Sequence, residues 1–193
     1  MEYYCRQDFV KGKPMTRREA REAVFGLLFE TDFHIQDTPQ GIYDVSCDNR
    51  DIGEDNYVRT AYFGVTEHMA HLDAIIEQYS HGWKAYRISG ISRAALRLCI
   101  WEMLYGSDIP HNVSINEALE LVKKYDDRQA RPFVNGVLNA AKNAIEAGEV
   151  VAETGNVSAE PQTADAGAEN ISDDAAVDNE QSPSGTTDIA KHE

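Results

Sequence analysis

The feature that most constrains the fold is a run of apolar residues at positions 91–106, ISRAALRLCIWEMLYG. A helix formed by this run carries apolar side chains on nearly every side, interrupted only by Ser92, Arg93, Arg97 and Glu102. A helix that is apolar all round has to be covered by other elements, so it belongs in the centre of a domain. The remaining elements should therefore pack around it.

Two segments before this run repeat apolar residues at the spacing of an α-helix. Residues 16–34 do so after Thr16 and Glu19, whose spacing is that of a capping box, and predict a helix of about five turns. Residues 56–80 predict one continuous helix. Between them, residues 35–55 combine Pro, Gly, Asp and Asn without a sustained apolar stripe, which predicts a loop with at most a short helical turn.

Two further helices are predicted after the central run. Residues 114–125 open with Ser114 and Glu117 at capping-box spacing. The pair Asn135-Gly136 is common in tight turns, but no alternating β-type residues flank it, so we predict a last helix that starts near Pro132 and contains the pair. No segment has the pattern of a strand. The predicted fold class is all-α, with five long helices and some short ones.

Negative charge is concentrated at the end of the chain. Of the formal net charge of −15, −11 comes from the 12 Asp or Glu and the one Lys found from Glu146 onward. This part has no Phe, Trp or Tyr and cannot bury enough apolar surface to offset the entropy of ordering. We therefore predict a flexible extension at 1–15, a folded domain at 16–147 and a disordered acidic tail at 148–193. Such a tail either solvates the domain or competes with nucleic acid for a basic face.

The common catalytic motifs are missing from the sequence. It has no glycine-rich phosphate loop and no G-x-S-x-G nucleophile elbow. His68 and His71 share a helical face with Asp73 nearby, but a metal site needs a further ligand, so a solvated helix face is favoured. The sequence predicts a protein that is not an enzyme and that has no cofactor and no metal.

The location of the protein is indicated by features near the N-terminus and by the cysteines. No apolar region of a signal peptide follows the N-terminal charges, and no apolar run approaches the ~20 residues of a membrane span. Cys5, Cys47 and Cys99 lie far apart and suit reduced thiols. A cytoplasmic protein without a membrane association is predicted.

Basic residues gather at the starts of two predicted helices. Residues 11–21 contain five Lys or Arg against one Glu, and Tyr79 closes the 56–80 helix. The second cluster, with its interleaved aromatic residues, consists of Lys123, Lys124, Tyr125, Arg128, Arg131 and Phe133. Cations neutralise phosphates and aromatic rings stack on unpaired bases, so the two clusters would form a single-stranded RNA site if they lay side by side. The pattern equally fits core aromatics with solubilising charges.

Five motifs occur together in this chain. They are RREAREAVFGLLFE, YSHGWKAYRIS, ISRAALRLCIWEML, DIPHNVSINEALELVKKY and RPFVNGVLNAAKN, in this order. In sequence and spacing they resemble the NusB family of bacterial transcription antitermination factors, over most of residues 16–145. The resemblance implies a compact all-α bundle of two small subdomains that binds RNA and is not an enzyme.

The resemblance also implies partners and site residues. NusB-family members bind boxA RNA in ribosomal RNA leader transcripts together with ribosomal protein NusE, and with other Nus factors they make RNA polymerase termination-resistant. The partner contact matches Ser92 and Arg93, although Ser92 stands where the family often carries an acid. Phe29 stands where many members have Tyr. The residues that match the family's RNA face are Arg17, Arg18, Arg21, Tyr79, Tyr125, Arg128, Arg131 and Phe133.

Alternatives to this function remain open at the level of sequence. A related helical domain precedes the catalytic part of some RNA cytosine methyltransferases. Such an enzyme needs several hundred further residues with a cofactor-binding βαβ core, whereas this chain continues into an acidic tail, so we expect a stand-alone factor. A purely structural helical protein is a third alternative, which RNA binding would distinguish. Some family members self-associate through the RNA face, which leaves a homodimer open.

Overall fold

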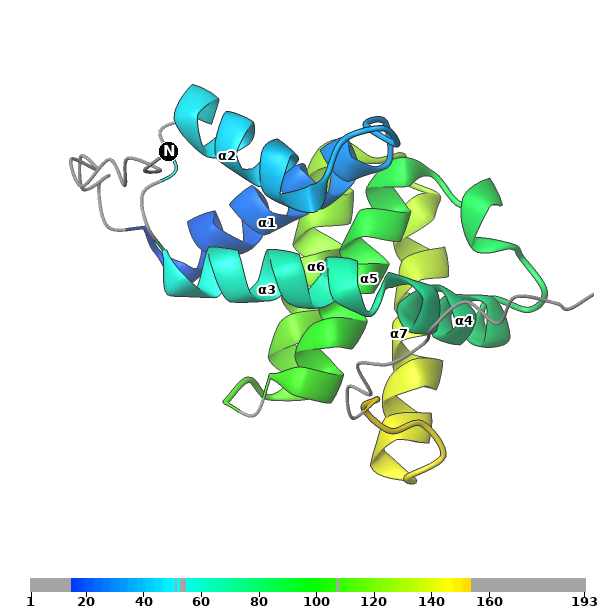
Figure 1. Cartoon of the computed structure of the whole chain (residues 1–193). Helices are drawn as coiled ribbons and strands as arrows, with labels where there is room; N and C mark the ends of the chain where they lie inside the picture. Colours follow the sequence, from blue (N-terminus) through cyan, green and yellow to red (C-terminus); the bar gives the residue numbers. More distant parts are fainter. Residues whose placement is uncertain (1–14, 51, 53–54, 107, 154–193) are drawn as a thin grey trace, which may run out of the picture. The chain divides into compact units, whose positions relative to one another are not determined.

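The computed structural model describes residues 15–50, 52, 55–106 and 108–153 (Figure 1). All of them belong to one compact unit, 1–155, whereas a second unit, 156–193, lies wholly outside the described residues. The predicted N-terminal extension, apart from its last residue, and nearly all of the predicted acidic tail also lie outside them.

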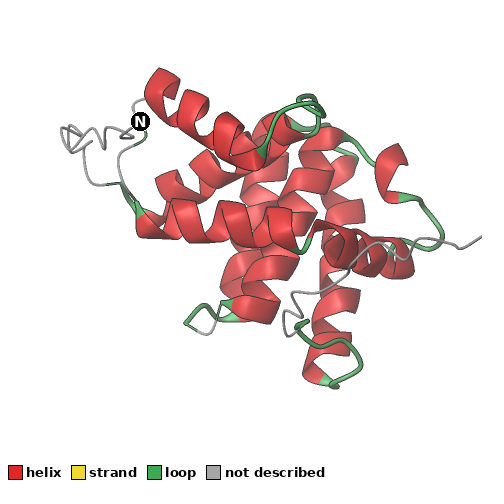
Figure 2. Cartoon of the chain, viewed as in Figure 1, coloured by secondary structure: helices red, strands yellow, loops and turns green. Residues whose placement is uncertain are grey.

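All regular structure in these ranges is helical (Figure 2), and the predicted all-α fold class is confirmed. A short 3-10 helix, η1 (Ala85–Arg87), precedes the central helix. The α-helices are α1 (Arg17–Thr31), α2 (Pro39–Arg50), α3 (Asn56–Glu67), α4 (Met69–Tyr79), α5 (Gly90–Tyr105), α6 (His111–Tyr125) and α7 (Ala130–Glu146).

Helix α5 is the central helix that its composition predicts. Its residues from Ala94 to Met103 are all buried, and it contacts α1, α3, α4, α6 and α7. In Figure 1, α6 and α7 run beside α5, while α3 crosses its front. The other helices thus form two groups, one of α1–α3 and one of α4, α6 and α7. Both groups contact α5 and share one continuous hydrophobic core.

Local sequence explains where α1 begins. Thr16 Oγ1 accepts a hydrogen bond from Glu19 N at 3.2 Å, and Glu19 Oε2 accepts one from Thr16 N at 2.7 Å. The predicted capping box is therefore confirmed. The helix ends at Thr31 with Asp32 as its C-cap, so its 15 residues are fewer than the predicted five turns need.

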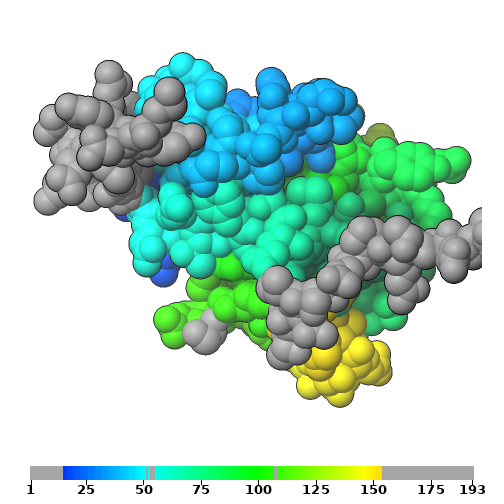
Figure 3. Space-filling view, in the orientation of Figure 1, coloured from blue at the N-terminus to red at the C-terminus, as the bar shows by residue number. Residues whose placement is uncertain are grey.

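The loop predicted for residues 35–55 is wrong, because most of that stretch forms the 12-residue helix α2. Ile42, Tyr43 and Cys47 form a short buried stripe. The ring of Tyr43 packs on Tyr62 of α3 with centroids 5.8 Å apart, and Figure 3 shows α2 and α3 next to each other on the surface. Packing against α1, and of Tyr43 against Tyr62 and Phe63 of α3, stabilises a helix that its Asp, Asn and Gly residues do not favour.

The single helix predicted for residues 56–80 is also wrong. It is broken at His68, which caps the end of α3 and the start of α4. Helix α3 lies very close to α5 at Gly64, where an added Cβ would meet Trp101 Nε1 at 2.5 Å. The break lets α4 change direction and pack on α5 and α7. The apolar period continues through both helices, as with Val65 and Leu72, so the spacing does not reveal the break.

The last two helices begin earlier than their sequence patterns indicate. Helix α6 follows Pro110, so Ser114 lies inside it and is buried, and the capping box predicted for Ser114 and Glu117 is wrong. Helix α7 begins at Ala130 and includes Pro132 in its first turn, where a missing N–H costs little. The pair Asn135-Gly136 lies inside α7, as predicted.

The described chain continues beyond α7. Gly148 adopts a positive φ of 75°, and Val150 then folds back into the core with 8% of its surface exposed. The folded chain therefore extends some residues past the boundary expected at residue 147. None of the helices in the described ranges is long and apolar enough to cross a membrane.

Candidate nucleic-acid interface

The basic residues from the two predicted helix starts meet at one carboxylate, Glu120 of α6. Arg18 of α1 lies 3.8 Å from it through Nη2, as does Arg131 of α7, and Lys123 Nζ lies 3.6 Å away. We call these four residues the Glu120 cluster. The structure thus brings together ends of α1, α6 and α7, the arrangement on which the predicted RNA site depends.

The ion pairs of the Glu120 cluster are loose. The side chains of Arg18, Lys123 and Arg131 are 65%, 62% and 50% exposed, and all three distances to Glu120 exceed those of a direct hydrogen bond. Pairs of this kind contribute about 0–1 kcal/mol each. A phosphate group can therefore replace Glu120 as their partner at small cost.

Arg17 and Arg21 lie one turn apart on α1 but at different depths. Arg17 is exposed, with its guanidinium 4.6 Å from the centre of the Tyr57 ring. Arg21 is 6% exposed, and its Nε donates a hydrogen bond to Glu102 Oε1 of α5 at 2.8 Å. Burial alone would lower the pKa of Arg21, but the carboxylate of Glu102 outweighs burial and raises it. Arg21 thus joins α1 to α5 as a charged, buried group.

The phenol of Tyr57 completes this buried pair. Its hydroxyl donates a hydrogen bond to Glu102. Burial, and then the negative charge of Glu102, raise the pKa of Tyr57, which keeps the hydroxyl protonated as a donor. Tyr57 therefore connects the exposed Arg17 to the buried pair below it.

Tyr125 is a fixed, partly exposed ring at the end of α6, with 42% of its surface exposed. It stacks on Phe25 of α1 with centroids 5.4 Å apart and 22° between the planes. Its hydroxyl donates to Glu22, which also accepts from Lys124 Nζ at 2.6 Å. The hydrogen bonds from Lys124 and Tyr125 lower the pKa of Glu22. These contacts hold Tyr125 against the middle of α1.

The other predicted RNA-binding residues surround the start of α7 or lie on α4. Arg128 is exposed and has no hydrogen-bond or ion-pair partner among the described residues. Phe133 is half-buried against the core, and its ring lies 6.3 Å from that of Trp83, which is 56% exposed. Tyr79 is half-buried at the end of α4, a helix that packs on α7. Phe133 thus faces both the core and the surface.

The predicted partner residues, Ser92 and Arg93, are both engaged inside the protein. Ser92 is 2% exposed and donates to Asp126 Oδ2 at 2.6 Å, and Ser89 donates to the same oxygen at 2.5 Å. Burial opposes ionisation of Asp126, but the hydrogen bonds from the two serine hydroxyls, together with those from the backbone of Asp127 and Ser92, outweigh it and lower its pKa. Arg93 donates to Asp32 Oδ2 at 2.7 and 3.0 Å. Both residues fix the start of α5 to neighbouring helix ends.

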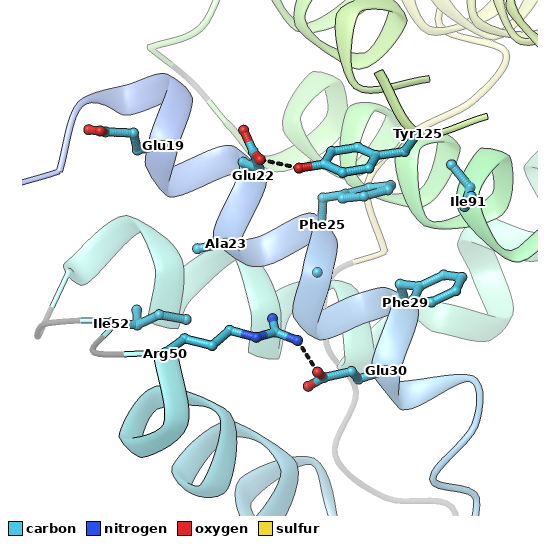
Figure 4. Close-up of a pocket in the computed structure, with 11 residues that line it drawn as sticks. Glu19, Glu22, Ala23, Phe25, Phe29, Glu30, Arg50, Ile52, Ile91 and Tyr125 are labelled. Atoms are coloured by element: carbon cyan, nitrogen blue, oxygen red, sulfur yellow. Dashed lines mark hydrogen bonds and ion pairs between the residues drawn. The ribbon is translucent and has the colours of Figure 1, made fainter. Parts of the chain in front are cut away.

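A groove of about 690 Å³ runs along α1 next to this junction (Figure 4). In Figure 4, the Phe25–Tyr125 stack lies on one side of it and the ion pair of Glu30 with Arg50 on the other. The residues that line the groove are Glu19, Glu22, Ala23, Phe25, Gly26, Phe29, Glu30, Arg50, Ile52, Ile91 and Tyr125. The groove therefore offers exposed apolar surface with carboxylates at its rim.

The carboxylates that organise this surface have no signature in the local sequence. Among the ion pairs of the Glu120 cluster, that of Lys123 with Glu120, three residues apart, is local. Glu22 is separated from Lys124 by 102 residues, and Asp126 from Ser92 by 34. Such pairings depend on helix packing and have no short-range pattern.

His68, His71 and Asp73, which share a helical face in sequence, do not form a metal site in the described structure. Asp73 accepts a hydrogen bond from Arg97 Nε at 2.7 Å. His68 and His71 each have Nδ1 3.9 Å from Glu153 Oε2. Within the described ranges, no group of three or more His, Cys, Asp or Glu residues is arranged to hold a metal ion.

Fold and surface together define a class: an all-α domain with a cationic face that carries exposed aromatic rings, features common in nucleic-acid-binding modules. The model of the NusB family matches residues 18–143, and the chain belongs to that family. It is 41% identical over 133 residues to the transcription antitermination protein NusB of Bacillus velezensis, which covers 68% of this chain and 99% of the relative. The protein of the same name from Bacillus subtilis is 40% identical over 132 residues, covering 68% and 98%.

Two solved structures are similar to this chain. NusB of T. maritima has a TM-score of 0.63 and 30% identity, covering 72% of this chain and all (100%) of that one. A chain in a crystal structure of antitermination factors NusB and NusE in complex with dsRNA has a TM-score of 0.60 and 27% identity, covering 66% and 96%.

Proposed function

We propose that this protein is a transcription antitermination factor that binds boxA-type single-stranded RNA of ribosomal RNA leader transcripts together with ribosomal protein NusE. In doing so it makes RNA polymerase termination-resistant. The observation that carries this proposal is the Glu120 cluster, in which cations from three helices share one weakly held carboxylate. The antitermination proteins among its relatives support the antitermination role, and the NusB–NusE complex with dsRNA supports RNA binding together with NusE.

Phosphates of the RNA backbone take the place of Glu120. Arg18, Lys123 and Arg131 exchange their loose contacts with the carboxylate for contacts with phosphate oxygens, and Arg128 adds a cation that has no described partner to give up. Binding of this kind releases counterions and weakens as the salt concentration rises.

Aromatic side chains supply faces for unpaired bases. Tyr125 is held by Phe25 at the end of α6, and Phe133 lies at the start of α7. Tyr79, at the end of a helix that packs on α7, is a further half-buried ring proposed for stacking. Arg17 contacts the RNA backbone from the start of α1, and Arg21 positions that helix start through Glu102.

The partner NusE docks on the groove along α1 in this proposal. Ser92 and Arg93 are positioning residues, because their polar atoms are occupied by Asp126 and Asp32. They present Ile91 and Phe29, which line the groove, as the apolar contacts. Tyr125 lines the groove and also belongs to the RNA face, so partner and RNA can meet at one ring.

The protein acts in the cytoplasm by binding, without catalysis or a cofactor. The alternative, a helical domain of the kind attached to RNA cytosine methyltransferases, receives less support. The relatives described above are matched over 99% and 98% of their own lengths, and both are antitermination proteins.

The direct test measures the affinity for fluorescently labelled boxA-type RNA by anisotropy, at two salt concentrations and with or without NusE. We expect binding that weakens with salt and strengthens with NusE. A duplex of the same sequence is the comparison, and it should bind more weakly because its bases are stacked and paired. Binding that is absent, or independent of salt, in both the presence and the absence of NusE would refute the proposal.

A further inference from the structure

We propose that Trp83, in the linker between α4 and α5, is a base-stacking residue that extends the RNA face beyond Phe133. This inference rests on the proposed RNA-binding function and adds a surface outside the predicted site residues. The occupant is an unpaired nucleotide of the RNA strand held at the Glu120 cluster.

The ring of Trp83 continues the predicted site. It lies 6.3 Å from the Phe133 ring, with 58° between the two planes, and 56% of the residue is exposed. Trp is on average among the most buried residue types, so an indole exposed to this extent next to another aromatic ring is informative. Two neighbouring rings on a surface offer faces on which successive bases stack.

The backbone of Trp83 is fixed by the turn before it. His81 and Gly82 both have positive φ angles, 54° and 85°, which end α4 and reverse the chain. Ser80 is 1% exposed and donates its hydroxyl to the carbonyl oxygen of Trp83 at 2.7 Å. A ring on a fixed backbone loses little entropy when a base stacks on it.

The rest of the linker is fixed from both sides. Glu77 of α4 accepts hydrogen bonds from Ala85 N at 3.1 Å and Lys84 Nζ at 2.8 Å. Arg93 of α5 donates to the carbonyl oxygens of Ala85 and Ile88 at 3.0 and 3.3 Å. Ala85 and Ile88 are buried, so the linker is a rigid part of the domain that keeps Trp83 outside.

The charges around Trp83 favour RNA over a protein partner. The linker HGWKAYRIS contains two cations and no Asp or Glu; Lys84 is paired with Glu77 of α4, so Arg87 is the cation that the linker adds. Arg128, exposed and without a partner in the described ranges, lies just before the helix that carries Phe133. Cations interleaved with exposed rings match a strand of phosphates and bases.

Intrinsic fluorescence tests the inference on the full chain. The chain has two tryptophans, and Trp101 is only 7% exposed, so Trp83 is the one that RNA can reach. Titration with unlabelled boxA-type RNA should quench the emission in parallel with the anisotropy of labelled RNA. In Trp83→Phe the quenching should disappear, while affinity stays within about two-fold because a stacking face remains.

Two alanine variants give the energetic test. Trp83→Ala should weaken RNA binding about ten-fold. The matched control is Tyr86→Ala, which removes a ring that is 71% exposed in the same linker but has no ring contact with Phe133, and it should change affinity less than about two-fold. Thermal unfolding of each variant establishes that it folds. If Trp83→Ala does not fold, the loss of fluorescence quenching in Trp83→Phe still tests the inference.

The outcomes separate this inference from the proposed function. If the RNA binds by anisotropy without quenching Trp83, and Trp83→Ala binds as tightly as the unmodified chain, the inference is overturned and the function stands. Equal weakening by Trp83→Ala and Tyr86→Ala also overturns it, because a general effect of the linker would then explain the loss. If no RNA binds, the proposed function itself fails.

Discussion

Two carboxylates, Glu102 and Glu120, each gather an arginine from α1, but in opposite surroundings. The side chain of Glu102 is 1% exposed and accepts a hydrogen bond from Arg21 at 2.8 Å. The side chain of Glu120 is 38% exposed, and Arg18, one turn earlier on α1, lies 3.8 Å from it. The two pairs therefore use the same chemical groups at different depths.

Depth decides what each pair contributes. A buried carboxylate has no water to replace a lost partner, so Glu102 and Arg21 depend on each other and fix α1 to α5. Glu120 is solvated, so its cations can leave it for a phosphate without exposing an unpaired buried charge. The buried pair serves the fold, and the exposed cluster is available for binding.

The largest expected effect is the loss of the buried pair. Arg21→Ala leaves Glu102 buried without its cation and should lower the free energy of unfolding by about 3–5 kcal/mol. Urea denaturation followed by circular dichroism measures this loss. Arg18→Ala is the matched control on the same helix and should change stability by less than about 0.5 kcal/mol. Equal effects of the two variants would contradict the distinction between the pairs.

The next largest effect concerns RNA affinity without a loss of stability. Arg128→Ala and Arg131→Ala should each weaken boxA-type RNA binding several-fold and reduce the slope of log affinity against log salt by about 1. Their thermal midpoints should stay close to that of the unmodified chain, because both side chains are exposed. A large fall in the midpoint would make these arginines structural.

A smaller effect in the opposite direction is expected from Glu120→Gln. The change removes the carboxylate that competes with phosphate for Arg18, Lys123 and Arg131, so RNA should bind about two- to five-fold more tightly. Glu117→Gln is the control, because Glu117 pairs with one of these three cations, Arg18. It should therefore change the RNA affinity less than Glu120→Gln does. If Glu120→Gln weakens binding, the carboxylate contributes directly to the RNA site.

The smallest effect is a dependence of stability on acid. The pKa of Asp126 is lowered in the folded protein, so its contribution to stability is present above the unfolded pKa of about 3.9 and is lost as the pH falls through the folded pKa. The difference in stability between the unmodified chain and Asp126→Asn should therefore shrink below about pH 4. Urea midpoints at pH 7 and pH 3 measure it, and a constant difference would contradict the role of the two serines.

Sequence patterns predicted those elements whose causes are local. The capping box at Thr16 and the tolerance of Pro132 in a first helical turn depend on neighbours within a few residues, and both are confirmed. Helix α2 and the break at His68 depend on packing against distant helices, so the same rules missed them. The false cap at Ser114 shows that a local pattern is also insufficient when the chain before it continues the helix.

The candidate site divides in the same way. Its cations are predictable because Lys and Arg cluster along the chain at 11–21 and 123–133, and the second range also contains Tyr125 and Phe133. The pairing of the cations at Glu120 and the burial of Arg21 are not predictable in this way. Contacts between residues on different helices leave no pattern in the local sequence. The partner contact shows this most clearly, because Ser92 and Arg93 are occupied inside the protein.

By itself, the sequence determined that this protein is all-α, that residues 91–106 form its centre, and that its basic residues cluster at two helix starts. It could do so because periodicity, composition and charge are properties of short segments. Only the tertiary structure decided which arginine is buried, which carboxylate the exposed cations share, and where Trp83 and Phe133 meet. Those outcomes depend on contacts between helices far apart in the chain. At each contact, the surrounding solvent or protein sets the strength of the interaction between the charges.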